Sequence, residues 1–410
     1  MTNKNIIIVL YPLKLRKFDL DRYEIKYLKK KFNIELHEFN GILYPKFISS
    51  FRKNIATDKR IFSFNSIEKW QNHIFKIKNK ILKNSKKIFV INFLGHDSYN
   101  ETRIFLFLKK VGIKRIDLLN VGLPKYRYEK VVISNYFHVI FKIGQLIFRT
   151  KSAFGTTVIL IKRYILNNLI GRFLNIKPEF LLIAGNKYYM NEQNKNIKCI
   201  KGNSWDYSRY VRHSGSANFK REKNYAVFLA NPGPKNPYAD SFLYDAKIIL
   251  TTKNWYLSLD RFFLKLENLF GIKVIIASHP KSKNEKKLNY LGSRRAYSNK
   301  TIDLVKNSKF VITSSSTSIS YALLYKKPIY FIYSNELKKN PSLMKTIFFL
   351  SKLLGTNSFN IDDFFNKDLI LSSKKINKKK YIYFIKNYLT SRQDKKANFQ
   401  IIQELIESRR

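Results

Sequence analysis

The amino-acid sequence predicts an α/β protein built from two doubly wound domains that face a central cleft. Short runs rich in Ile, Val, Leu and Phe, apolar at nearly every position, are typical of parallel strands covered on both faces. Helical stretches separate these runs, as in α/β folds. The length of 410 residues exceeds one ordinary core and suits two domains.

The first series of elements predicts a Rossmann-like domain over residues 1–186. The expected strands are 5–13, 34–39, 87–95, 115–124 and 179–186. The stretches 66–84 and 101–112 between them show helical spacing of apolar residues. Residues 5–13 form an apolar run that Pro12 and charges soon interrupt, which favours a first strand over a signal peptide.

A polar break, residues 187–223, is expected to be a linker and cleft loop with little helix. A second series then predicts a Rossmann-like domain over 224–376, with strands at 225–230, 273–280, 309–315 and 328–334. A helix over 254–270 is expected to end at Gly271. Residues 377–410 form a charged helical stretch that is able to pack back on the first domain.

The formal charge of +50 indicates attraction to polyanions or anionic surfaces. An AT-rich genome explains the abundant Lys equally well. The basic residues are spread along the chain, and no zinc-finger, RRM or KH signature occurs, so no specific nucleic-acid partner is expected. Cys199 is the only cysteine, which excludes an internal disulfide and fits a cytoplasmic setting.

No segment has the roughly 18 uninterrupted apolar residues that a membrane span needs. Residues 131–173 are long apolar stretches punctuated by cations. This pattern fits a basic amphipathic insertion lying among lipid headgroups. The competing interpretation is a pair of core helices with solvated basic faces.

Two polar motifs follow expected strands of the second domain. His279 and Pro280 end one strand, where an imidazole can donate to a phosphate oxygen. Five hydroxyl residues, 314–318, lie between the next strand and a helical stretch, where side chains and free backbone N–H groups suit a phosphate. The competing interpretations are a simple turn and an N-cap, although one hydroxyl suffices for capping.

This order of motifs resembles the C-terminal half of bacterial GT-B glycosyltransferases of lipopolysaccharide and capsule synthesis, in particular those that use CMP-activated sialic or Kdo-type acids. The resemblance covers residues 225–360 by motif and the first half by architecture only. It implies that the donor nucleotide phosphate is bound by His279, Pro280, Ser314, Ser315, Ser316 and Thr317. Teichoic-acid polymerases with CDP-linked donors are similar rivals.

The resemblance also implies a reaction without a metal or other cofactor, the nucleotide-sugar being a substrate. The sequence holds one DxD triplet, Asp19-Leu20-Asp21, which we interpret as a helix start far from the donor half. The pair Asp362-Asp363 is likewise interpreted as a helix start.

In the resembling enzymes an acidic residue of the N-terminal domain removes the acceptor's proton. Asp97 and Glu101, which follow a strand, are the candidates here, with a plain N-cap at Asp97 as the alternative. Asp240, in a loop after the first strand of the second domain, is a rival base, although Ala230 and Asn231 supply no acid directly after that strand.

Further donor contacts are expected from two places. Gly233 permits close backbone approach to a ligand. Arg294 and Arg295 are able to reach a donor carboxylate or phosphate, unless they form solvated surface. The stretch 205–210 is expected to be a loop at the same cleft.

Together these features favour an enzyme, a GT-B glycosyltransferase that is cytoplasmic and peripheral at the inner face of the plasma membrane. Its expected partners are a nucleotide-sugar, a lipid-linked oligosaccharide acceptor and an anionic membrane surface. The alternatives are a teichoic-acid-type CDP-polyol phosphotransferase and a non-catalytic basic scaffold for membranes or nucleic acid with a degenerate GT-B fold.

Overall fold

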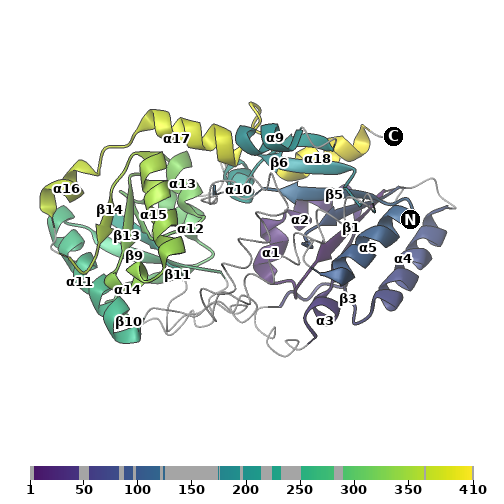
Figure 1. Ribbon diagram of the computed structural model, residues 1–410, viewed down its shortest axis with the longest axis horizontal. Coiled ribbons are helices and arrows are strands. Elements are labelled where there is room, and N and C mark those ends of the chain that lie inside the picture. Colours follow the sequence, from purple (N-terminus) through teal and green to yellow (C-terminus); the bar gives the residue numbers. More distant parts are fainter. Residues whose placement is uncertain are drawn as a thin grey trace, which may run out of the picture.

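The computed structural model has two parallel α/β domains side by side (Figure 1). The structure describes residues 4–45, 55–82, 87–95, 98–120, 123–124, 174, 176–193, 197–213, 224–231, 251–280, 290–363 and 366–408. The predicted basic insertion, 131–173, lies outside the described residues. None of the described helices is long and apolar enough to cross a bilayer.

The first sheet has the strand order β3-β2-β1-β4-β5-β6-β7, with every pair parallel. Its strands are β1 (Ile6–Tyr11), β2 (Asn33–Glu38), β3 (Ile61–Ser63), β4 (Ile88–Asn92), β5 (Lys114–Leu119), β6 (Phe180–Ala184) and β7 (Lys198–Gly202). All five predicted strands are confirmed, and β3 and β7 are additional. The order reverses between β1 and β4, the kind of position where open α/β sheets bind ligands.

Alternate residues of β1 enter two different cores, which explains its unbroken apolar run. Ile7 and Val9 pack into the core on one face of the sheet, whereas Ile8 and Leu10 pack into the core on the other face. The second of these cores is covered by α4 (Ile67–Leu82) and α5 (Tyr99–Lys110), which confirm the two predicted helices. The described part of this domain also contains α1 (Lys17–Arg22), α2 (Ile25–Leu28) and α3 (Asn40–Leu43).

The second sheet has the order β11-β9-β8-β12-β13-β14, also parallel throughout. Its strands are β8 (Tyr225–Leu229), β9 (Lys273–Ser278), β11 (Ala296–Ser298), β12 (Val311–Thr313), β13 (Ile329–Tyr333) and β14 (Ser358–Asn360), and β10 (Tyr290–Ser293) lies outside it. The four predicted strands are confirmed. The chain leaves β8 towards β9 and returns on its other side as β12, so this sheet also has a switch point.

The helices of the second domain include α11 (Thr252–Phe270), which ends at Gly271 in the left-handed conformation (φ 58°), as predicted. The others described are α12 (Thr301–Asn307), α13 (Ile319–Leu324), α14 (Asn335–Lys338), α15 (Pro341–Leu354) and α16 (Lys367–Ser372). The short α13 follows the hydroxyl-rich turn after β12.

The prediction of a helix-poor loop between the domains is wrong for residues 186–213. This segment forms α9 (Asn186–Gln193), β7 and α10 (Trp205–His213). β7 pairs with β6 and extends the first sheet. α10 packs against α13 of the second domain, so it lies between the domains as an ordered element.

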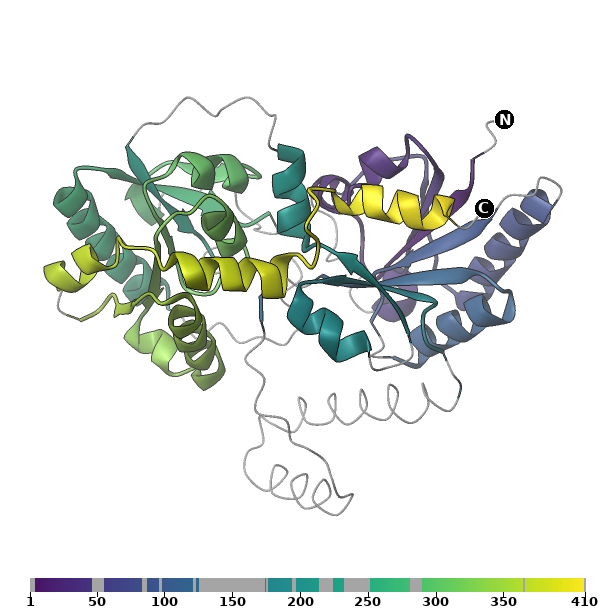
Figure 2. The ribbon, with the colours of Figure 1, turned by 90° about the horizontal axis from the view of Figure 1, so that it is seen from above.

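The C-terminal segment crosses from the second domain to the first (Figure 2). α17 (Lys378–Phe384) places Tyr381 and Phe384 in the core of the second domain. It continues as a π-helical turn, η4 (Ile385–Leu389), and the chain then forms α18 (Asn398–Glu407). Ile401 and Ile402 of α18 are buried in a core of the first domain, which confirms that this segment packs back.

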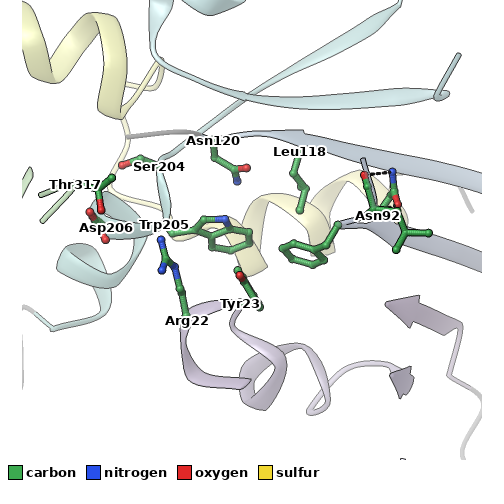
Figure 3. A pocket seen from close by; sticks show the side chains of 11 residues that line it. Arg22, Tyr23, Asn92, Leu118, Asn120, Ser204, Trp205, Asp206 and Thr317 are labelled. Carbon is green, nitrogen blue, oxygen red and sulfur yellow. Dashed lines mark hydrogen bonds between the residues drawn. The ribbon is translucent and has the colours of Figure 1, made fainter. Parts of the chain in front are cut away.

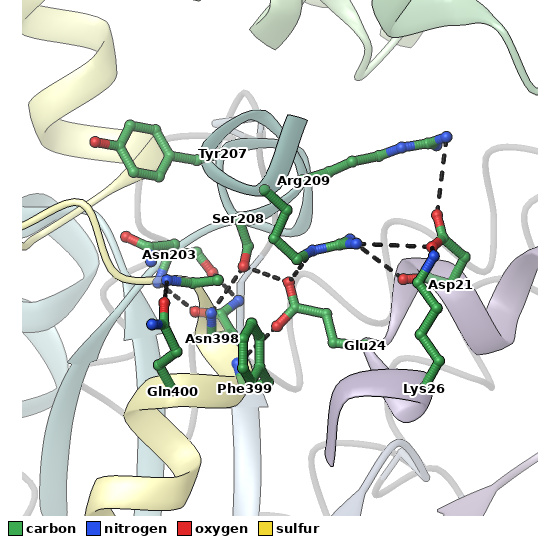
Figure 4. Close-up of polar contacts among 12 residues, drawn as sticks. Asp21, Glu24, Lys26, Asn203, Tyr207, Ser208, Arg209, Asn398, Phe399 and Gln400 are labelled. Atoms are coloured by element: carbon green, nitrogen blue, oxygen red, sulfur yellow. Dashed lines mark hydrogen bonds and ion pairs between the residues drawn. The ribbon is translucent and has the colours of Figure 1, made fainter. Parts of the chain in front are cut away.

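One buried carboxylate links these crossing segments (Figure 4). Glu24, 1% exposed and at the start of α2, accepts hydrogen bonds from Ser208 Oγ, from Arg212 Nε at 3.1 Å and from Phe399 N at 2.6 Å. Burial raises the pKa of Glu24, and Arg212 opposes that shift. The Glu24 carboxylate thus links α10 and α18 to the first domain by hydrogen bonds.

Candidate functional site

Two adjoining cavities lie where the carboxyl ends of the two sheets face each other. The first, the His279 cavity, has a volume of about 270 Å³ and contains His279, Thr317 and Ser318 from the second domain. The second, the aromatic cavity, has a volume of about 300 Å³ and is lined mainly by the first domain. The residues common to both are Arg22, Trp205, Asp206 and Thr317.

The His279 cavity brings together the two motifs that the sequence singled out. His279 follows β9 and the hydroxyl-rich turn follows β12, and these strands flank β8 on opposite sides. Because all three strands are parallel, their carboxyl ends lie on one edge of the sheet. The imidazole and the hydroxyls of Thr317 and Ser318 therefore line one cavity.

The hydroxyls that line the cavity differ in part from those that the resemblance implied. Ser314 is 3% exposed, Ser315 Oγ accepts from Asn231 Nδ2 at 3.2 Å, and Ser316 Oγ accepts from Ser318 N at 3.3 Å. Ser314 is thus buried, and Ser315 and Ser316 are hydrogen-bonded to other groups of the protein. Of the five hydroxyl residues, only Thr317 and Ser318 are among those that line the cavity.

Asp206 is the carboxylate at the junction of the two cavities, and the sequence reasoning did not identify it as a candidate. It lies in the first turn of α10, behind Ser204, whose Oγ accepts from Tyr207 N at 3.2 Å. The Tyr321 hydroxyl donates a hydrogen bond to Asp206 Oδ1 at 3.2 Å. Burial raises the pKa of Asp206, and the Arg22 cation partly offsets that rise. The sequence did contain a signal for this residue, because Asp206 closely follows β7, a strand of the first domain.

Three rings form the wall of the aromatic cavity (Figure 3). Phe93 follows β4, and its ring lies 5.9 Å from that of Trp205 at an angle of 24°. Tyr23 packs on both, with ring centroids 4.3 Å from Phe93 and 5.2 Å from Trp205. Asn120, just beyond β5, also lines the cavity, and its Nδ2 has no hydrogen-bond partner within the described parts of the chain.

Of the three residues predicted as catalytic bases, the structure describes only Glu101. Asp97 and Asp240 lie outside the described residues and stay predictions. Glu101 is 4% exposed and closes a capping box at the start of α5, where its carboxylate accepts from Ser98 N at 2.8 Å and Gly95 N at 3.0 Å. It is not among the residues that line either cavity.

Of the predicted donor contacts at 233 and 294–295, the structure describes only the two arginines, and neither of them lines either cavity. Gly233 lies outside the described residues. Arg294 is held by Asp260 and by Glu267, whose Oε2 lies 2.7 Å from Nη2, and its side chain is 7% exposed. This corrects the expectation that Arg294 reaches the donor. Arg295 is exposed just before β11 and lines neither cavity.

The DxD triplet lies in α1, as interpreted, but the expectation that it is far from the donor half is wrong. Asp21 lines the His279 cavity, because the first sheet's switch point faces that of the second. Its carboxylate is 2.6 Å from Lys26 Nζ and 3.6 Å from Arg212 Nη1. The Asp362 pair lies in a turn before α16 and not in a helix start, and Asp362 accepts from Asn335 N at 2.7 Å.

A further group of potential metal ligands is Glu35, His37 and His73, with ligand atoms within 4.8 Å of one another. Trp70 Nε1 donates to His37 Nδ1 at 3.1 Å, so the proton of this neutral imidazole is on Nε2, 3.1 Å from Glu35 Oε2. That nitrogen then has no lone pair for a metal. The arrangement fits a hydrogen-bonded triad between β2 and α4.

No protein-family model matches the sequence, and neither does any curated protein. Among solved structures, the wall teichoic acid polymerase TagF matches with a TM-score of 0.50 and 13% identity, covering 100% of this chain and 89% of that one. The UDP-GlcNAc 2-epimerase of Methanocaldococcus jannaschii matches with a TM-score of 0.48 and 12% identity, covering 98% and 99%. With two parallel α/β domains meeting at the carboxyl ends of their sheets, the chain has the GT-B fold.

Proposed function

We propose that the chain is a glycosyltransferase that moves a sugar from a nucleotide-linked donor to a hydroxyl of an acceptor glycan. The observation that carries the proposal is the convergence of His279, Thr317 and Ser318 with Asp206 around adjoining cavities at both switch points. This arrangement combines hydrogen-bond donors for a phosphate with a carboxylate that has a raised pKa.

In the proposed reaction, His279, Thr317 and Ser318 donate hydrogen bonds to the donor phosphate. Asp206 accepts the proton of the acceptor hydroxyl as that oxygen bonds to the anomeric carbon. The bond between that carbon and the phosphate oxygen breaks, and the phosphate keeps the electron pair. Lys17, Arg22 and Arg209 line the same cavity and supply positive charge near the leaving group, which supports a reaction independent of a metal ion.

The finer predictions belong to this proposal. We retain a CMP-linked acidic sugar as donor, a lipid-linked surface glycan as acceptor, and a cytoplasmic site at the inner membrane face. The net charge of +50 supports the last of these, because each cation near an anionic leaflet contributes about 1 kcal/mol of attraction.

A second candidate is a CDP-polyol phosphotransferase of the teichoic-acid type. The likeness to TagF favours it, since that polymerase was also determined with CDPG. His279, Thr317, Ser318 and Asp206 would have the same roles in this reaction. The acceptor oxygen would instead attack phosphorus, and the product would be a phosphodiester. Mass analysis of products from activated sugars and activated polyols distinguishes the two reactions.

The test of donor binding is a thermal-shift series with CMP, CDP, UDP and GDP. We expect one nucleotide to stabilise the protein, by about 2.7 kcal/mol at a concentration 100 times its Kd. His279→Ala should remove this stabilisation. His73→Ala, a histidine outside both cavities, is the matched control and should keep it. Indifference to all four nucleotides would favour the non-catalytic scaffold and overturn the proposal.

A further inference from the structure

The aromatic cavity contains two buried donor atoms that the protein itself leaves unsatisfied. Asn120 is 7% exposed, and its Nδ2 has no partner among the described residues; the same holds for Arg22 Nε. An unsatisfied buried donor typically costs about 1–3 kcal/mol, so native structures usually supply a partner. Both side chains line the cavity, and Figure 3 shows the Asn120 amide on the opposite side from Arg22.

The second asparagine that lines the aromatic cavity, Asn92, differs from Asn120 because its side chain is fully hydrogen-bonded within the protein. Asn92 also lines the cavity, but its Nδ2 donates to Asp117 Oδ1 at 3.0 Å and its Oδ1 accepts from Leu94 N at 2.9 Å. Asn92 is therefore fully engaged in positioning the turn after β4. The Asn120 amide, by contrast, has a donor available for a ligand in the cavity.

The rings of the cavity form one apolar wall and not a slot. Phe93 and Trp205 are nearly parallel, but their centroids are only 5.9 Å apart, so the rings contact each other and leave no space for a third ring between them. A planar base normally stacks between two rings, and this cavity offers no such space. A wall of this kind suits a ring whose C–H face packs on aromatic carbon while its hydroxyls meet polar groups at the rim.

We propose that the aromatic cavity binds one sugar ring of the acceptor, with its apolar face on Trp205 and Phe93 and its hydroxyls accepting from Asn120 Nδ2 and Arg22 Nε. This inference rests on the proposed function and names its acceptor class as a cyclic sugar rather than an open polyol phosphate. The volume, about 300 Å³, is at the lower end of ligand pockets and suits a single ring. Asp206, shared with the His279 cavity, then lies beside a hydroxyl of that ring.

Tryptophan fluorescence tests the proposal directly. The other two tryptophans, Trp70 and Trp255, are 0% and 6% exposed, so Trp205 is the one that a ligand in the cavity contacts. The full chain would be titrated with methyl glycosides of a hexose, an N-acetylhexosamine and a sialic acid, and with glycerol 3-phosphate and cytidine, each with and without the stabilising nucleotide. We expect a saturable change with at least one glycoside, and no such change in Trp205→Phe.

Asn120→Ala should weaken glycoside binding about tenfold, since a buried hydrogen bond is lost. Asn307→Ala, which removes an amide on α12 that donates to Asp303 O, is the matched control and should bind normally. Stabilisation by nucleotide should be unchanged in both variants, and it also reports that each is folded. Absence of any glycoside response, a response to glycerol 3-phosphate or cytidine alone, or unchanged affinity in Asn120→Ala would each overturn the inference. These outcomes are independent of the proposed function, which is tested separately by whether nucleotides stabilise the wild type and fail to stabilise His279→Ala.

Discussion

The carboxylate of Asp206 lies near Arg22 and accepts a hydrogen bond from the Tyr321 hydroxyl. Burial raises the pKa of Asp206 above its ordinary value, and the hydrogen bond from Tyr321 lowers it. Burial also raises the pKa of Tyr321 far above its usual range, so that side chain stays a neutral donor. Burial, Arg22 and Tyr321 therefore all influence the pH at which the Asp206 carboxylate becomes a base.

Replacing Asp206 or Tyr321 should change the pH profile in different ways. Asp206→Asn should lower kcat by about 10²-fold or more, because no group accepts the proton. Activity needs the ionised carboxylate, so it falls as the pH drops through the pKa of Asp206. Tyr321→Phe removes a contact that lowers this pKa, so the fall should move to higher pH.

The measurement is transfer rate against pH, with Tyr325→Phe as control. Tyr325 is bonded to His213 and lines neither cavity, so its variant should keep the wild-type profile. A Tyr321→Phe profile shifted to lower pH would contradict the assignment of Asp206 as the base.

Among the elements, β6 and η4 approach each other closely at the backbone near the crossing between domains. Gly185, directly after β6, has φ +78°. A Cβ at this position would lie 2.2 Å from Asn387 O and 2.6 Å from the Cα of Tyr388, both in η4. The π-helical turn therefore lies against a position that only glycine can occupy.

Gly185→Ala should destabilise the protein by about 3 kcal/mol, from left-handed strain and from backbone overlap. Gly112→Ala is the matched control, because Gly112 has φ +71° but a Cβ added there would meet no atom within 4 Å. The control should cost only about 1–2 kcal/mol. Urea unfolding monitored by circular dichroism measures the free energy of unfolding of each variant. Equal losses of this free energy in the two variants would contradict the prediction, because they would show that η4 moves away from the added Cβ at no cost.

For the whole molecule, the dominant property is an excess of 78 Lys and Arg over 28 Asp and Glu. If this charge serves membrane association, sedimentation with anionic vesicles should be strong at ~0.05 M salt and largely lost at ~1 M, where the Debye length falls to about 3 Å. Neutral phosphatidylcholine vesicles are the control and should bind little. Equal binding to both vesicle types, or none to either, would leave the base composition of the genome as the explanation of the charge.

Much of the fold was predictable because its strands are apolar on both faces. Residues 5–13 and 225–230 carry this pattern, and each became a central strand, β1 and β8. β3 was missed because it has only three residues, and β7 because Lys198, Lys201 and Gly202 interrupt its apolar pattern. α10 was missed because the stretch 205–213 is rich in charged and aromatic residues, and its order depends on packing against α13 and on Glu24.

Periodicity and strand-ending residues were enough to predict the two-domain α/β fold and the two polar motifs of the second domain, because both signals act between near neighbours in the chain. The folded chain was needed to show that Arg22 and Asp206 line the cavity that contains His279, and that both also line the adjoining cavity with Asn120. The reversal of strand order in both sheets brings their loops to one cleft. That juxtaposition depends on how the sheets are assembled, which no local pattern records.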